Sequence, residues 1–151
     1  MTKDKYLKII STCIQGSISS RCRDILEKVG KEQMVLGIVF FFEASCLDDY
    51  LESESAIVEA CREHFGKAAP VVTCVAQKPI GTTLTAEVLY LREDATVEYS
   101  EDYIIIRGEK GAELITKGIH CPHEGDTGAQ ARRIFGRIRQ ILTDAEERGG
   151  R

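Results

Sequence analysis

The carboxylate Glu87 stands alone inside an apolar stretch, TLTAEVLYL. If this stretch is a strand, Leu84, Ala86, Val88 and Tyr90 alternate onto one face and Glu87 points to the opposite face. A carboxylate in such a position is either a solvated or ion-paired strand residue or a candidate for positioning a proton or a water molecule. Glu87 is therefore the first residue whose surroundings need to be known.

A second group of reactive side chains is the run His120-Cys121-Pro122-His123. Its spacing matches no zinc pattern, and the sequence offers no second ligand pair for a four-coordinate site. Glycine-rich phosphate loops, a nucleophile elbow and HExxH are all absent from the sequence. We expect neither a metal ion nor a cofactor.

Overall charge argues against nucleic acid as a partner. The chain has 151 residues, a formal net charge of -4 and a pI near 5.5, whereas nucleic-acid binding needs cations that neutralise phosphates. Four arginines near the C-terminus (Arg132, Arg133, Arg137 and Arg139) could meet RNA, but the wet face of an amphipathic helix explains them more simply. The longest apolar run, 34–42, is about half of the ~20 residues that span a bilayer. Without a visible signal peptide, the expected location is the cytoplasm.

The six cysteines are scattered and form no CxxC pair: Cys13, Cys22, Cys46, Cys61, Cys74 and Cys121. In a chain without a secretion signal, this usage predicts small buried hydrophobic residues rather than a disulfide framework.

Apolar periodicity and turn residues predict three helices and six or seven strands. The first segment, 5–14, reads as a strand or as the start of a helix, and we favour a strand. The other expected strands cover 34–42, 71–76, 82–91, about 96–99, 103–107 and 112–116, and the helices run from Ser17 or Ser19 to Val29, over 47–65 and over about 127–148. Gly108 and Gly111 predict a hairpin turn between the last two strands.

These elements predict an α+β fold: a mixed sheet with about three helices packed on one face. The other face of the sheet still carries apolar residues and no fourth helix is available. A partner subunit is the expected cover.

Two stretches of the sequence resemble the RidA family, also called YjgF. The first, 20–91, has a helix, a buried strand, the acidic "DDY" start of a second helix, "HFG" at the end of that helix, a proline and two strands, and it resembles the C-terminal two-thirds of the family domain. The second, 98–149, contains GIHCPHEGDTGAQARRIFGRI and resembles the N-terminal half. The halves thus occur in reversed order within a single domain of residues 1–151, either as a permuted or fused variant or as a relative with an added hairpin and helix.

The resemblance implies a chorismate-mutase-like fold and a homotrimer whose open sheet faces are buried, with ligand clefts between subunits. It implies hydrolysis of imine or enamine intermediates, with Glu87 holding the attacking water as the catalytic residue. Thr73, Cys74, Lys117 and Gly118 fall at positions that line the substrate site.

One departure from the family pattern bears on the activity. The arginine that binds the substrate carboxylate is replaced by Val72, which offers neither charge nor donor. Lys117 is then the candidate for a substitute cation.

Three functions remain open from the sequence. The chain is a trimeric protein that binds a small metabolite and hydrolyses imines, a binding or regulatory module without catalysis, or an endoribonuclease or translation initiation inhibitor, as members of the family have been called. The acidic pI disfavours the third. Val72, in the place of the arginine, slightly favours the second function over the first.

Overall fold

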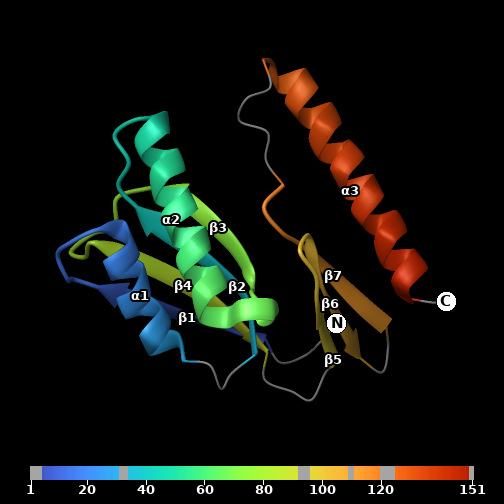
Figure 1. The fold of residues 1–151 in the computed structure, drawn as a ribbon, viewed down its shortest axis with the longest axis horizontal. Helices are drawn as coiled ribbons and strands as arrows, with labels where there is room; N and C mark the ends of the chain where they lie inside the picture. Colours follow the sequence, from blue (N-terminus) through green and yellow to red (C-terminus); the bar gives the residue numbers. More distant parts are fainter. Residues whose placement is uncertain (1–4, 31–33, 92–95, 109–110, 120–124, 150–151) are drawn as a thin grey trace.

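The structure is a computed structural model that describes residues 5–30, 34–91, 96–108, 111–119 and 125–149 (Figure 1). Helices and strands follow the predicted order along the chain. Their bounds are β1 (Lys5–Thr12), α1 (Ile18–Val29), β2 (Met34–Phe42), α2 (Leu47–Phe65), a 3-10 turn (Gly66–Ala68), β3 (Val71–Ala76), β4 (Leu84–Leu91), β5 (Thr96–Tyr99), β6 (Tyr103–Gly108), β7 (Gly111–Thr116) and α3 (Thr127–Gly149). The sequence-based bounds of the helices and strands agree with these to within two residues at every end.

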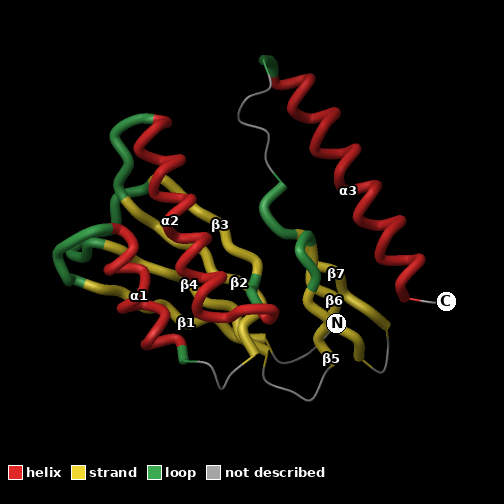
Figure 2. The backbone as a smooth tube through the Cα atoms, viewed as in Figure 1, coloured by secondary structure: helices red, strands yellow, loops and turns green. Residues whose placement is uncertain are grey.

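The first four strands form one sheet in the order β1-β4-β2-β3. Neighbouring strands are antiparallel except for β2 and β3, which run parallel because α2 connects them. Helices α1 and α2 cover one face of this sheet (Figure 2). Their apolar stripes, which include Cys22, Leu26 and Ile57, close over Phe40 and Tyr90 in the main core.

Local signals set the ends of both helices. The hydroxyl of Ser17, one of the two candidate caps in the sequence, accepts a hydrogen bond from the amide of Ser20 and caps α1. At the start of α2 the Asp49 carboxylate accepts from both the amide and the hydroxyl of Ser45. Gly30 and Gly66 end the helices with φ of 76° and 58°, a region that suits glycine.

The expectation of a single sheet with all three helices on one face is wrong. Strands β5, β6 and β7 form a separate three-stranded sheet, and α3 packs on that sheet rather than beside α1 and α2 (Figure 1). The reason lies in β6, whose residues are apolar on both faces. Ile104 packs against the end of the first sheet and Ile105 packs under α3.

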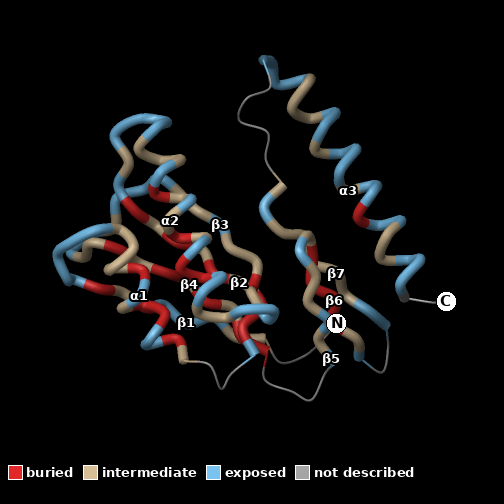
Figure 3. The backbone as a smooth tube through the Cα atoms, in the orientation of Figure 1, coloured by how far each residue is buried: buried red, intermediate tan, exposed pale blue. Residues whose placement is uncertain are grey.

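The second sheet covers part of the face that α1 and α2 leave bare. Leu36 and Leu91 from the first sheet form a cluster with residues of β6. An ion pair between Lys5 and Glu113 also joins the two sheets. None of the described helices covers the remainder of this face, where part of β1 is exposed (Figure 3). We name this remainder the open face, and its residues are Leu7, Ile9, Ser11, Val39, Phe41, Thr73, Val75, Thr85 and Glu87. Within the described residues, no helix has the combination of length and apolar composition needed to cross a membrane.

Candidate functional site

Strand register arranges the open face in rows. Glu87 is paired with Ile9 of β1 on one side and with Val39 of β2 on the other, and Val39 is paired with Thr73 of β3. Residues directly opposite one another share a face of the sheet. Glu87 and Thr73 therefore lie on the same face, two strand spacings or about 10 Å apart.

Glu87 has an unusual setting for a carboxylate. Its nearest cross-strand neighbours are the apolar side chains of Ile9 and Val39, and its own side chain is half-buried. In the part of the chain that the structure describes, neither a hydrogen bond nor an ion pair is made by its carboxylate. A carboxylate loses solvation in such a place without a compensating partner, which is more typical of a group kept for a ligand than of one kept for stability.

Hydroxyl groups fill the next row. The hydroxyls of Ser11 and Thr85 lie 3.0 Å apart across β1 and β4, and that of Thr82 lies 2.9 Å from Thr85. Together with Thr73 they give the open face groups that both donate and accept hydrogen bonds.

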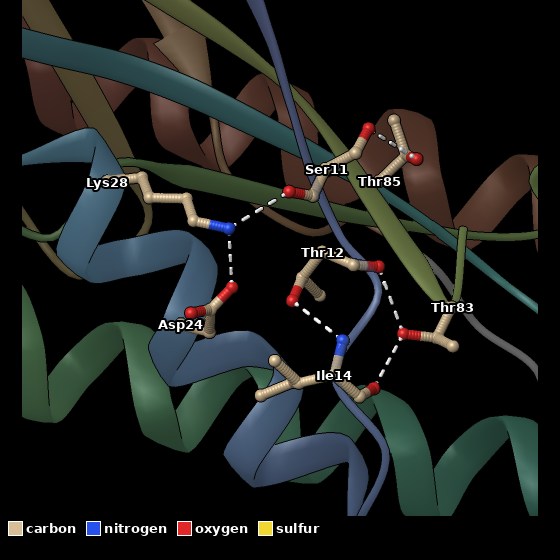
Figure 4. A network of polar contacts seen from close by, with 7 residues as sticks. All are labelled: Ser11, Thr12, Ile14, Asp24, Lys28, Thr83 and Thr85. Atoms are coloured by element: carbon tan, nitrogen blue, oxygen red, sulfur yellow. Dashed lines mark hydrogen bonds and ion pairs between the residues drawn. The ribbon is translucent and has the colours of Figure 1, made fainter. Parts of the chain in front are cut away.

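A network of polar contacts fixes this end of β1 (Figure 4). The ammonium of Lys28 on α1 donates to the carbonyl of Ser11 and to the carboxylate of Asp24. The hydroxyl of Thr83 lies 3.0 Å from the carbonyls of Thr12 and Ile14. These contacts hold the strand that carries Ser11 and Ile9 against both β4 and α1.

Cys74 lies on the other face of the sheet. Its strand neighbour Phe40 belongs to the main core, and Cys74 and Val72 both pack against that core. The Tyr50 hydroxyl lies within hydrogen-bond distance of both the Cys74 carbonyl, at 3.2 Å, and the Glu54 carboxylate, at 3.0 Å. Burial raises the pKa of the Cys74 thiol to about 12 and that of Tyr50 to about 12. The thiol is therefore neutral near pH 7, and the structure does not bring it together with Glu87.

Lys117 is held at the covered end of the sheet. Its ammonium donates to the carbonyl of Ala69 at 2.8 Å and to that of Ser100 at 2.6 Å. Burial lowers the pKa of this ammonium against the opposing effect of Asp102 and Glu101. Ala69 lies two residues before β3 begins, so Lys117 joins the two sheets, and two of its three donors are already used. Gly118 follows it with a φ of 38°.

The structure thus divides the predicted site residues into three places. Glu87 and Thr73 share the open face, Cys74 lies behind the sheet, and Lys117 with Gly118 lies at the junction of the two sheets. The sequence analysis missed Ser11, Thr85 and Ile9, which the strand register brings beside Glu87. Alternation along 5–12 places Lys5, Leu7, Ile9 and Ser11 on one face of a strand. Only the pairing of β1 with β4 shows that this face is the one that carries Glu87.

The cysteines only partly match the expectation of buried thiols. Cys22 and Cys61 are buried and Cys74 is half-buried, whereas Cys13 and Cys46 are exposed. The two exposed cysteines fall in a loop and at a helix N-cap, where the chain has no core to enter.

No cluster of three or more potential metal ligands occurs among the described residues. Cys121 and the predicted run His120-Cys121-Pro122-His123 lie outside them. The four arginines of α3 are exposed, as expected from their helical positions, and Arg137 forms an ion pair with Asp102 at 2.6 Å.

The fold and the open face define an α+β protein with a mixed sheet, one face of which is only partly covered by its own chain. No family model matches the sequence, and no curated protein matches it. Its fold is similar to those of several solved structures, and one of these is described as a member of the YjgF/YER057c/UK114 family.

Three solved structures illustrate this similarity. A candidate endoribonuclease from Thermotoga maritima aligns with a TM-score of 0.45 and 17% identity, over 62% of this chain and 83% of that one. A candidate translation initiation inhibitor from Salmonella typhimurium aligns with a TM-score of 0.46 and 10% identity, over 59% and 83%. A member of the YjgF/YER057c/UK114 family from Mycobacterium tuberculosis aligns with a TM-score of 0.43 and 17% identity, over 57% and 79%.

Proposed function

We propose that the protein binds a small metabolite with a protonated nitrogen on its open face, in a cleft that further copies of the chain close, as in a homotrimer. One observation carries the proposal. Glu87 presents a half-buried carboxylate without an ion-pair partner among the described residues, in a row with Ile9, Val39 and Thr73. An ammonium or iminium group is the partner that such a carboxylate favours, and the nearby hydroxyls suit a polar ligand.

Hydrolysis of an imine is the enzymatic form of this proposal. Water adds to the C=N carbon, the C–N bond breaks, and a ketone and ammonia leave. Glu87 would accept a proton from the water as a general base. Among the described residues, the row around Glu87 supplies no cation for a substrate carboxylate, because Val72 and Cys74 face the core and Lys117 is bound to two carbonyls. The geometry therefore favours binding over efficient turnover of an imino acid.

A coupled assay tests both forms. An amino-acid oxidase generates the imine in the presence of the purified protein, and ammonia release is compared for the wild type, Glu87→Gln and Glu52→Gln. The matched control, Glu52, is an exposed carboxylate on α2, on the other side of the sheet. Acceleration that is lost only in Glu87→Gln supports the enzyme.

Binding without acceleration is tested by NMR with a simple amine, such as ethylamine, as the probe. Shifts of the amides around Ile9, Val39 and Thr73 that disappear in Glu87→Gln support a binding module. If the protein shows no acceleration and no Glu87-dependent shifts, the proposed site is contradicted.

A further inference from the structure

Two exposed apolar surfaces of the chain lie on opposite sides of the second sheet. On α3, the side chain of Phe135 is 69% exposed and that of Leu142 is 47% exposed. On the open face, Leu7 and Ile9 are 65% and 68% exposed. Strand β6 stands between these surfaces, because Ile104 packs toward the first sheet and Ile105 toward α3. They are therefore separated within one molecule.

The exposed surface of α3 has the spacing of a docking stripe. The exposed Phe135 and Leu142 lie on one side of the helix with the half-buried Ala131 and Ile138, because the four residues follow one another at intervals of four, three and four. Of the described residues of α3, only Ile141 and Ala145 enter the cluster with the second sheet. The helix therefore has a wider apolar arc than its own sheet covers. Most of α3 is exposed or half-buried (Figure 3).

Dimensions favour the open face as the complement of this stripe. Phe135 and Leu142 are seven residues apart, which is about 10 Å along the helix at 1.5 Å per residue. Leu7 and Ile9 are two residues apart, which is about 7 Å along β1. The two pairs of long side chains can therefore meet when α3 lies along β1 of another molecule.

The charges of the two surfaces are complementary. Arg139 lies one turn from both Phe135 and Leu142, and Arg132 lies one turn before Phe135. Neither arginine makes an ion pair with another described residue, and neither does Glu87. The open face therefore offers a carboxylate beside apolar side chains, and α3 offers an arginine beside apolar side chains.

We propose that α3 of one copy docks along β1 on the open face of a second copy, with Phe135 and Leu142 against Leu7 and Ile9 and with Arg139 paired with Glu87. The contact is heterologous, so it propagates from copy to copy until a ring closes. This inference goes beyond the proposed function. Docking requires no ligand, and Arg139 of the docking copy and a cationic ligand compete for the Glu87 carboxylate.

Analytical ultracentrifugation of the ligand-free full chain at 1–100 µM, on the order of the affinity of a modest interface, tests the docking. We expect an assembly larger than the 16.8 kDa monomer. Phe135→Ala, Glu87→Arg and Arg139→Glu should each weaken it about tenfold or more, while the double variant Glu87→Arg/Arg139→Glu should recover most of the loss. The control Arg148→Glu changes an exposed charge at the far end of α3 and should leave the assembly unchanged.

Two results would overturn the docking. The first is a wild-type protein that stays monomeric throughout this range. The second is an assembly that Phe135→Ala dissociates but that neither charge reversal affects, which would indicate pairing of α3 with α3. Circular dichroism of each variant separates loss of docking from loss of folding. A monomer that still hydrolyses imines through Glu87 would contradict the docking and support the proposed function. A ring that binds no ligand would support the docking and contradict the proposed function.

Discussion

Glu87 and Cys74 lie on opposite faces of the four-stranded sheet. The register makes this clear, because Phe40 is paired with both Cys74 and Ala86, and these three residues face the main core. Glu87, one residue after Ala86, must then face the other way. A ligand on the open face can therefore contact Glu87 without contacting the thiol, and Cys74 belongs to the packing under α2.

Cysteine accessibility gives a direct test of this arrangement. Burial raises the pKa of the Cys74 thiol to about 12, so the thiolate that attacks an alkylating reagent is scarce at pH 8. We expect iodoacetamide to modify the exposed Cys13 and Cys46 in the native protein and to leave Cys22, Cys61 and Cys74 unmodified. Peptide mass spectrometry reads the sites, and the unfolded protein is the positive control. Modification of native Cys74 at the rate of Cys13 would contradict the assigned face.

Replacement of Lys117 tests its role at the junction of the two sheets. Lys117→Met removes the donor that the carbonyls of Ala69 and Ser100 share. A hydrogen bond from a charged donor contributes about 1.5–3 kcal/mol, and water can replace part of it at a half-buried site. We expect the free energy of unfolding to fall by about 1–3 kcal/mol, measured by urea denaturation. Lys67→Met, at an exposed lysine near the same junction, is the control and should change it by less than about 0.5 kcal/mol. Equal effects of the two variants on the free energy of unfolding would show that Lys117 does not stabilise the junction.

Local patterns were enough to predict nearly every helix and strand, because periodicity, caps and glycines act within a few residues. They also placed Glu87 opposite the core-facing residues of its strand. The separation into two sheets was not predictable in this way, since β6 reads as an ordinary apolar strand until both of its faces are assigned partners. Ser11 reaches the neighbourhood of Glu87 through pairing across more than seventy residues of chain, which no local pattern encodes.

The acid stability of the start of α2 depends on Asp49. Its carboxylate accepts from the amide and the hydroxyl of Ser45, and these bonds hold its pKa below the ordinary 3.8. Because the folded state binds the proton less readily than the unfolded state, the stabilisation is present above pH 3.8 and is lost as the pH falls through the lower, folded pKa.

We therefore expect the Asp49→Asn variant to have a lower melting temperature than the wild type at pH 7. Near pH 2, below the ordinary pKa of an aspartate, the two melting temperatures should approach each other. Calorimetry at several pH values measures the difference. Asp48→Asn, one residue earlier in the same turn, is the matched control, because no contact with Ser45 depends on it in the described residues. A difference between wild type and Asp49→Asn that stays constant with pH would contradict this account.

Substitutions on the two faces of α3 should affect different properties, the stability of the fold on one face and self-association on the other. Ile141 is 2% exposed and packs with Tyr103 and Ile105, so Ile141→Ala should lower the free energy of unfolding by about 2–4 kcal/mol. Leu142 is the next residue, but it lies on the exposed stripe, and Leu142→Ala should change the stability of dilute protein by less than about 0.5 kcal/mol. If α3 docks on a second copy, the same Leu142→Ala variant should weaken self-association several-fold. A Leu142→Ala variant that unfolds as readily as Ile141→Ala would show instead that the stripe packs within its own chain.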